Sequence, residues 1–207
     1  MKMPYLVKTP ALLKWFYPDL TWHKSRTEKI IYLTFDDGPI PEVTPFVLKT
    51  LAEFEAKATF FCIGDNVQKY PDIFEQVKTG GHAIGNHTFN HLRGWDTPDE
   101  VYLQNTKKCN ELVKANFFRP PYGRAKKSQF AVLKKHYEVI MWDVLSGDFD
   151  PDLSPQKCYQ NVVDKSSNGS IIVFHDSLKA FPRTQYALPK ALEYWREHGY
   201  QFKSLQG

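Results

Sequence analysis

The chain has 207 residues, of which 42% are apolar and 24% charged, and its formal net charge is +4. One domain of this length can bury about 70% of the surface that its unfolded chain exposes. No stretch approaches the roughly 18 consecutive apolar residues of a membrane span. The basic residues are scattered, whereas nucleic-acid binding needs a concentrated patch. We therefore expect a soluble, ordered protein with no nucleic-acid partner and no membrane span.

The N-terminal segment lacks the features of a secretion signal. Its apolar patch is short, is interrupted by Pro10, Lys14 and Pro18, and shows no small-residue cleavage pattern. We expect a cytoplasmic protein by default, or the mature form of an exported one. The cysteines are odd in number and lack C-x-x-C spacing, which predicts neither a disulfide framework nor a thiolate zinc site and slightly favours a reducing compartment.

The predicted elements alternate between β-branched or aromatic runs and helical patterns. In chain order they are a strand at 30–35, a helix at 42–55, a strand at 58–63, a helix at 72–79, a short strand at 82–85 and a helix at 98–115. After the pair Phe117-Phe118 come a helix at 127–136, a strand at 139–142, a helix at 155–165, a strand at 170–174, a helix at 187–198 and a strand at 200–203. Thr97, with Glu100 three residues later, predicts a capping box for the helix at 98–115.

About seven strand and helix pairs, without a repeat or a linker, predict a parallel α/β architecture. The pattern leaves open whether the strands form a barrel or a doubly wound sheet. In both architectures the active site lies on the loops that follow the carboxyl ends of the strands. A polar motif is therefore more informative where it follows a predicted strand.

Two adjacent carboxylates, Asp36 and Asp37, end the first strong strand within the run T-F-D-D-G-P. Their mutual repulsion is unfavourable unless a cation or a proton offsets it. Asp-Gly and Gly-Pro are also common turn dipeptides. Taken alone, this run leaves a turn and a functional site both open.

A histidine pair follows the predicted strand at 82–85. If the chain enters a helical turn there, His87 and His91 at positions i and i+4 present their imidazoles on one face. Two histidines and one carboxylate leave a coordination position open, as in a catalytic metal site. Such a pair is often coincidental, but in combination with Asp36 and Asp37 it favours a metal site.

Three further runs of polar residues follow predicted strands. In R-P-P-Y-G the prolines hold the backbone extended, so that Arg119 can point inward and the amide of Tyr122 can face a substrate oxyanion, although a surface polyproline turn is the alternative. Acids lie in M-W-D-V-L-S-G-D-F, and His175 ends the apolar run I-I-V-F. A lone histidine after a strand is more often a structural hydrogen-bonding residue. Five such runs are improbable by chance, so together they favour an active site.

In content and order these runs resemble the motifs of the polysaccharide deacetylase family, also called the NodB homology domain or carbohydrate esterase family 4. Its motifs are T-F-D-D-G, H-T-x-x-H, R-x-P-Y, an acid followed by an aromatic residue, and L-x-H. Here they extend from Thr34 to His175, about two thirds of the chain. The resemblance implies a distorted, incomplete (β/α) barrel with about seven parallel strands. We expect residues 28–207 to form a single catalytic domain, and residues 1–27 to be an extension that packs on the barrel.

The resemblance also implies roles for individual residues. The matches to the metal ligands are Asp37, His87 and His91, with Zn2+ the usual occupant and other divalent ions such as Co2+ also accepted. Asp36 matches the general base that takes a proton from a metal-bound water. The amide of Tyr122, which follows Pro121, matches the group that shares the oxyanion with the metal.

The remaining matches complete the acid and base chemistry. His175 matches the general acid that protonates the leaving amine. Arg119 resembles the residue that keeps the base ionised through an ion pair, and Asp148 resembles the acid that tunes the base and acid pair.

Three positions depart from the common family pattern. Phe149 stands where many members carry Trp, so stacking area is kept but the indole donor is lost. Val173 stands where Leu is usual, which predicts a slightly wider pocket for the acetyl methyl group. Leu145 occupies a position that is acidic in some members, which makes Asp148 the better candidate for the tuning acid and leaves the role of Asp143 open.

The implied function is metal-dependent removal of N-acetyl groups from an N-acetylated glycan, such as peptidoglycan or a chitin-type oligosaccharide. An esterase or amidase acting on another acetylated or cyclic-amide substrate would use the same metal chemistry. A non-catalytic glycan-binding module is a third hypothesis, suggested by the 15% aromatic content. The complete set of metal, base and acid residues argues against it. We expect the loops at 91–99 and 181–185 to shape the glycan groove.

Overall fold

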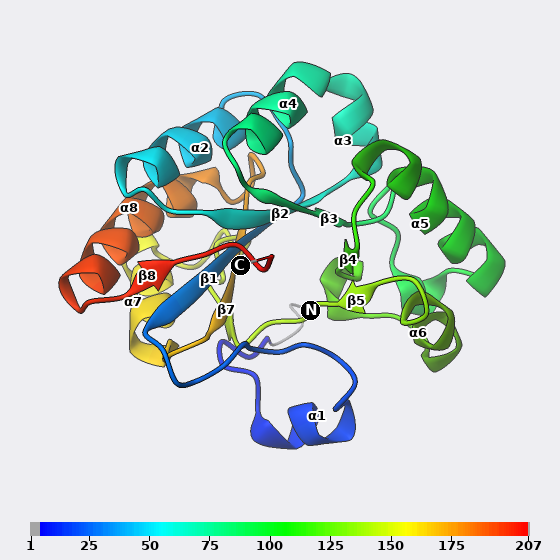
Figure 1. Cartoon of the computed structure of the whole chain (residues 1–207), viewed down its shortest axis with the longest axis horizontal. Helices are drawn as coiled ribbons and strands as arrows, with labels where there is room; N and C mark the ends of the chain where they lie inside the picture. Colours follow the sequence, from blue (N-terminus) through cyan, green and yellow to red (C-terminus); the bar gives the residue numbers. More distant parts are fainter. Residues whose placement is uncertain (1–4, 207) are drawn as a thin grey trace.

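The computed structural model describes residues 5–206, and Figure 1 shows a curved sheet with helices around its outside. The strands are β1 (Ile30–Asp36), β2 (Ala58–Cys62), β3 (Ala83–Asn86), β4 (Phe117–Phe118), β5 (Glu138–Val139), β6 (Val144–Leu145), β7 (Ile171–His175) and β8 (Gln201–Phe202). The helices are α1 (Ala11–Phe16), α2 (Val43–Glu53), α3 (Gly64–Lys69), α4 (Pro71–Thr79), α5 (Asp99–Val113), α6 (Lys127–Leu133), α7 (Pro155–Lys165) and α8 (Phe181–Glu197). Two short 3-10 helices are η1 (Gly94–Asp96) and η2 (Pro121–Gly123).

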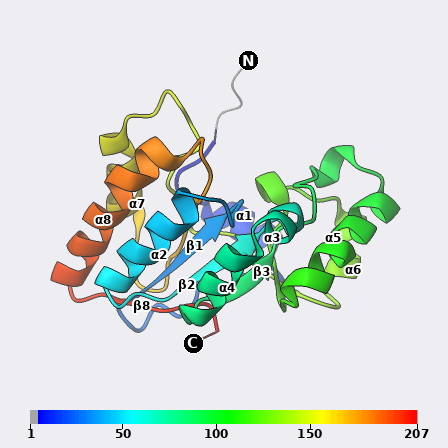
Figure 2. The ribbon, with the colours of Figure 1, turned by 90° about the horizontal axis from the view of Figure 1, so that it is seen from above.

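The strands form one row of parallel neighbours in the order β5-β4-β3-β2-β1-β7-β6, and β8 pairs with the start of β1. Within the described part of the chain, β5 and β6 at the ends of this row do not pair with each other. Figure 2 shows α2 beside α8 toward one end of the molecule and α5 beside α6 toward the other. The predicted incomplete barrel of parallel strands is therefore confirmed.

The central strands are buried on both faces, as their nearly continuous apolar sequences require. Phe35 of β1 stacks on Phe60 of β2 and Phe174 of β7, and this face of the sheet packs against the helices. Side chains alternate along a strand, so Asp36 and His175 point to the opposite face, inside the barrel. The alternation that builds the core thus directs the polar strand ends inward.

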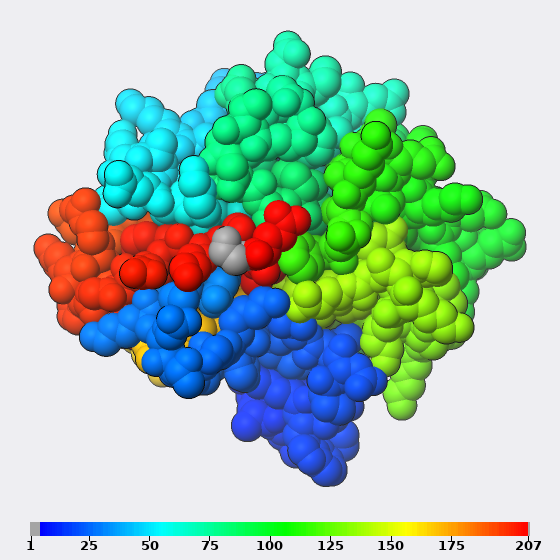
Figure 3. All heavy atoms as spheres, in the orientation of Figure 1, coloured from blue at the N-terminus to red at the C-terminus, as the bar shows by residue number. Residues whose placement is uncertain are grey.

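The N-terminal segment, residues 5–27, lies across the gap between the two ends of the row. Lys8 pairs with Val144 of β6, and Thr21 pairs with Ile140 directly after β5. In Figure 3 this segment, in blue, lies between the yellow-green and the orange parts of the surface. It thus occupies the opening of the incomplete barrel.

A buried carboxylate, Asp143, anchors this segment. Its oxygens accept hydrogen bonds from Lys8 at 2.7 Å, Lys14 at 2.5 Å and Arg26 at 2.9 Å, and from Ser170 at 2.7 Å. Burial alone would raise the pKa of Asp143, but these donors outweigh it and hold the pKa well below its usual range. The acid whose role the sequence left open therefore binds the cations of the N-terminal segment.

Several predicted elements differ from the observed ones. The last helix begins at Phe181 rather than at residue 187, with a proline in its first turn, so the loop predicted at 181–185 is helical. Of the strand predicted at 139–142, only Val139 lies in a strand, at the end of β5, and β6 begins later, at Val144. The helices α1 and α3 have no counterpart in the prediction. Short helices escape a pattern search because they supply too few turns for a periodic signal.

The predicted capping box at Thr97 is wrong. The hydroxyl of Thr97 donates back to the carbonyl of Arg93 at 2.7 Å, and α5 has no side-chain cap. Glu100 instead accepts a hydrogen bond from Gln104 on the outside of the helix. The 3-10 helix η1 directly precedes α5, and the hydroxyl of Thr97 bonds back across it to Arg93 instead of capping α5.

The cysteines Cys62, Cys109 and Cys158 are free and buried. No helix in residues 5–206 combines the length and the apolar character needed to cross a membrane.

Candidate active site

The strand β1 ends in two carboxylates that take different directions. Asp36 continues the strand and is 3% exposed, whereas Asp37 turns away with a left-handed φ of 89°. Asn66 stabilises this turn, because its side-chain amide donates to the carbonyl of Asp37 at 2.7 Å. The turn therefore separates two neighbouring carboxylates into two different environments.

Asp37, His87 and His91 bring three donor atoms within 4.8 Å of one another. Oδ1 of Asp37 lies 3.3 Å from Nε2 of His91 and 3.8 Å from Nε2 of His87. Two ligands of one tetrahedral ion, each bonded at about 2 Å, lie about 3.3 Å apart. Oδ1 of Asp37 is buried and has no hydrogen-bond partner among the described residues. This triad of one carboxylate and two imidazoles therefore fits a divalent metal ion.

The two histidines do not lie on a helical turn, so that part of the prediction is wrong. They lie on a loop after β3 in which Thr88 and His91 have positive φ angles of 64° and 54°. Asn86 holds the loop, because its Oδ1 accepts from the amide of Thr88 and its Nδ2 donates to the carbonyl of Thr106, both at 2.9 Å. The loop still brings the ring centroids of His87 and His91 within 5.1 Å of each other.

Both imidazoles are neutral and therefore suited to bind a cation. Nδ1 of His87 lies 2.8 Å from the backbone carbonyl of Arg119. A carbonyl only accepts, so Nδ1 carries the proton and Nε2 remains free as a ligand. Burial and the neighbouring His91 hold the pKa of His87 well below its usual range. Burial also lowers the pKa of His91, against the opposing charge of Asp37.

Arg119 holds the second carboxylate, Asp36, inside the barrel. Its Nη1 donates to Oδ1 of Asp36 and to the hydroxyl of Thr34, both at 2.7 Å. The other guanidinium nitrogens donate to the carbonyls of Ile140 and Met141. Burial lowers the pKa of Arg119, and the charge of Asp36 opposes that effect. Arg119 and Asp36 therefore form a buried ion pair inside the barrel.

The loop after β4 borders the metal triad. Pro121 is buried, and Tyr122 has a positive φ of 60° and is 52% exposed. The ring of Tyr122 lies 4.7 Å from the ring of His91 and 4.7 Å from the guanidinium of Arg93. The predicted oxyanion loop thus lies next to a metal ligand and faces solvent.

His175, at the end of β7, is the neighbour of Asp36 in the sheet. Its Nδ1 lies 2.7 Å from Oδ1 of Asp148, and its amide donates to Oδ2 of the same carboxylate at 2.7 Å. Thr184 of α8 also donates to Oδ2. Burial alone would lower the pKa of His175, but Asp148 outweighs it and raises the pKa to about 10. His175 is therefore protonated at neutral pH, as a general acid must be.

Phe149 and Val173 lie beside this histidine. The ring of Phe149 meets His175 edge-on at 5.3 Å and meets Tyr5 of the N-terminal segment at 5.0 Å. Val173 is buried two residues before His175, on the same inward face of β7. The structure therefore brings all the predicted site residues to one end of the barrel interior, and Asp143 lies apart from them.

Sequence reasoning missed Asp176, which directly follows His175. Its buried carboxylate accepts from the amide of Gly38 at 2.9 Å and from the hydroxyl of Thr44 at 2.7 Å. Burial raises the pKa of Asp176 to about 8, against these hydrogen bonds. A β-carbon on Gly38 would lie 1.9 Å from Asp176. Only glycine fits there, so Asp176 holds the turn that carries Asp37. In the sequence, the one indication of this role is the position of Asp176 directly after His175.

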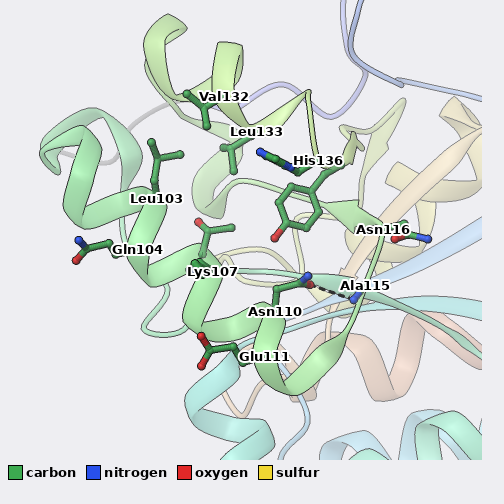
Figure 4. A pocket seen from close by; sticks show the side chains of 12 residues that line it. Leu103, Gln104, Lys107, Asn110, Glu111, Ala115, Asn116, Val132, Leu133 and His136 are labelled. Carbon is green, nitrogen blue, oxygen red and sulfur yellow. Dashed lines mark hydrogen bonds between the residues drawn. The ribbon is translucent and has the colours of Figure 1, made fainter.

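A cavity of about 650 Å3 lies elsewhere, between α5 and α6 (Figure 4). Its lining includes Gln104, Lys107, Asn110, His136 and Tyr137. None of the predicted site residues lines it. This cavity is therefore separate from the active site.

The amino-acid sequence is similar to a known protein family and to individual proteins of known activity. Residues 23–138 match the family model for polysaccharide deacetylase. A peptidoglycan-N-acetylglucosamine deacetylase of Bacillus cereus is 37% identical over 196 residues, which cover 90% of this chain and 91% of that protein. A chitooligosaccharide deacetylase of Azorhizobium caulinodans is 36% identical over 160 residues, which cover 73% of this chain and 76% of that protein.

Solved structures give the same result. The Bc1960 peptidoglycan N-acetylglucosamine deacetylase superimposes with a TM-score of 0.87 at 29% identity and covers 95% of both chains. PdaA of Bacillus subtilis, a family 4 carbohydrate esterase, superimposes with a TM-score of 0.81 at 25% identity. The matched residues, the incomplete barrel and the Asp-His-His triad agree, and the chain belongs to the polysaccharide deacetylase family.

Proposed function

We propose that this protein removes N-acetyl groups from a glycan that contains N-acetylglucosamine. The observation that carries the proposal is the placement of the carboxylate of Asp36, paired with Arg119, and the protonated imidazole of His175 on neighbouring strands beside the metal triad. Amide hydrolysis needs a base for the attacking water and an acid for the leaving amine. Relatives named for deacetylation of peptidoglycan N-acetylglucosamine and of chitooligosaccharides support this substrate class.

The metal is proposed to be Zn2+, held by Asp37, His87 and His91. Imidazole and carboxylate ligands with an open position are typical of catalytic zinc, and Co2+ accepts the same donors. A divalent ion there would acidify water and polarise the acetyl carbonyl. The chain's own contribution is the neutral state of both imidazoles and the fixed orientation of His87 by the carbonyl of Arg119.

The other residues each have one task in the proposed reaction. Asp36, held by its ion pair with Arg119, accepts the proton of the attacking water. The backbone N–H of Tyr122, which follows Pro121, donates a hydrogen bond to the acetyl oxygen as that oxygen gains negative charge. His175, held by Asp148, gives its proton to the nitrogen that leaves as a free amine. Phe149 and Val173 border the acetyl group and exclude water from it.

Acetate release from a substrate panel tests the proposal. Protein stripped with a chelator should be inactive on chito-oligomers, and Zn2+ or Co2+ should restore acetate release. Asp36→Asn should retain the metal, measured by elemental analysis, and lose activity by a factor of a hundred or more, the usual scale for a general base. Full activity in Asp36→Asn would contradict the assigned base.

The same panel separates the competing hypotheses. Muropeptides and acetylxylan are included at equal acetyl concentration, and a cyclic amide, which releases no acetate, is followed by its ring-opened product. Release from acetylxylan alone would indicate an esterase. Tight glycan binding without acetate release under any divalent ion would indicate a binding module, and would contradict the proposed function.

A further inference from the structure

A groove of about 350 Å3 runs between the N-terminal segment and the loops after β3 and β4. Its volume is within the usual range of small-molecule sites, about 300–1,000 Å3. Six aromatic side chains line it, Tyr5, Tyr17, Trp22, Trp95, Phe130 and Trp142. These come from the segment that occupies the barrel opening, from η1, from α6 and from the loop between β5 and β6. The groove is therefore formed only where the N-terminal segment packs on the barrel.

Trp95 is the most exposed of the tryptophans in this groove, at 55%, and its ring is fixed in place. Its indole N–H donates to the carbonyl of Ala125 at 3.1 Å, and the guanidinium of Arg124 lies 4.8 Å from the ring centroid. A large aromatic side chain held this way in solvent offers a flat apolar face without further loss of conformational entropy on binding.

A neighbour in the chain on one wall and a series of ring contacts on the other connect the groove to the active site. Gly123, which lines the groove, directly follows Tyr122 of the oxyanion loop, and a β-carbon on Gly123 would meet the ring of Trp142 at 2.4 Å. On the other wall, Tyr5 contacts Phe149, which contacts His175. The groove thus begins at both sides of the catalytic end of the barrel.

We propose that this groove binds the sugars that neighbour the acetylated residue in the substrate glycan. The inference rests on the proposed function, because a polymer whose N-acetyl group lies at the metal triad must continue beyond it. The C–H face of a pyranose is apolar and weakly positive, and an aromatic face carries negative charge density. Trp95 stacks on such a face, and the groove orients the chain relative to His175 and Tyr122.

The test compares Trp95→Ala with Trp15→Ala in the full chain with its metal restored. Trp15 lies on α1, is 72% exposed and does not line the groove, so it is a matched control. Acetate release is measured on chito-oligomers of two to six sugars. The wild-type kcat/KM should rise with chain length. Trp95→Ala should lose about tenfold on the hexamer through KM, which is about 1.4 kcal/mol, and least on the dimer; Trp15→Ala should follow the wild type.

A binding measurement keeps the inference separate from the proposed reaction. In the Asp36→Asn background, titration calorimetry with chitohexaose should show about tenfold weaker binding after Trp95→Ala, with unchanged thermal unfolding. If Trp95→Ala weakened binding but the protein with Asp36 intact released no acetate, the groove would stand as a glycan site and the proposed reaction would be rejected. An equal loss on every chain length, or unchanged binding and kinetics, would overturn the groove. A dimer in solution that Trp95→Ala dissociates would also overturn the proposal, because a second copy of the chain would then occupy the groove.

Discussion

The carboxylate of Asp148 binds His175 twice, once at the imidazole Nδ1 and once at the backbone amide, both at 2.7 Å. The two contacts fix the ring and its protonation together. The hydroxyl of Thr184 also donates to Oδ2 of Asp148 at 2.9 Å, so both oxygens of this buried carboxylate are hydrogen-bonded. This arrangement sets the pH range in which a proton can be given to a leaving amine.

Asp148→Asn should move the alkaline limb of the pH profile toward neutral pH. The acid acts in its protonated form, and the wild-type pKa of about 10 keeps it protonated until the pH rises through that value. Without the carboxylate, the burial that lowers the pKa is no longer outweighed. Profiles of kcat/KM from pH 6 to 11 measure the shift. Asp143→Asn, which removes a buried carboxylate that does not touch His175, should leave the alkaline limb in place.

Arg119→Met should be strongly destabilising, by about 3–5 kcal/mol, because it leaves Asp36 buried without its cation. Adding Asp36→Asn should recover part of that loss in urea unfolding, since the buried charge is then gone, but should not recover activity. Arg93→Met removes an exposed ion pair with Asp96 and should change stability by no more than about 1 kcal/mol. If the double variant were no more stable than Arg119→Met, the buried-charge explanation would fail.

The sequence predicted which side chains meet in the site better than how the backbone brings them there. His87 and His91 are close, but through a loop with two positive φ angles instead of a helical turn. Spacing along the chain indicates which residues can share a site. It does not indicate a backbone route stabilised by Asn86 and the distant Thr106.

Contacts between distant parts of the chain explain what the sequence left open or missed. The role of Asp143 stayed open because its partners Lys8 and Arg26 lie more than a hundred residues away. The support that Asp176 provides to Gly38 has the same character. Local patterns carry no signal for such pairs, whereas the strand ends and the family motifs are local and were predicted.

Asp143→Ala should loosen the N-terminal segment before the rest of the barrel. Lys8, Lys14 and Arg26 would then lose the buried carboxylate that holds them together, so hydrogen exchange in residues 5–27 should increase. Exchange in β1 and β2 should remain slow at low denaturant. Asp19→Ala, which removes an exposed pair with Lys134, serves as the control and should leave exchange unchanged. Uniform exchange across the chain in Asp143→Ala would show that the segment does not open separately.

His82 should make stability fall in mild acid. Its Nδ1 accepts a hydrogen bond from the amide of Ala58, and burial, with the nearby charge of Lys57, lowers its pKa to about 4. The unfolded chain takes up this proton near pH 6.5, so the folded state loses stability as the pH falls from about 6.5 to about 4. No loss from this group is expected above that window. Urea unfolding at several pH values should show a flatter profile for His82→Gln, and His136→Gln at the surface should keep the wild-type slope.

The N-termini of α7 and α5 differ in whether a side chain caps them. Ser154 precedes α7, and its hydroxyl accepts from the amide of Lys157 at 3.1 Å, whereas the hydroxyl of Thr97 bonds backward to Arg93 and leaves α5 without a side-chain cap. Ser154→Ala should therefore cost about 1 kcal/mol of unfolding free energy, the usual value of an N-cap hydroxyl. Thr97→Ala should cost less than about 0.5 kcal/mol, as expected away from a cap. Urea denaturation of both variants measures the difference, and equal losses would mean that Thr97 caps α5 in solution after all.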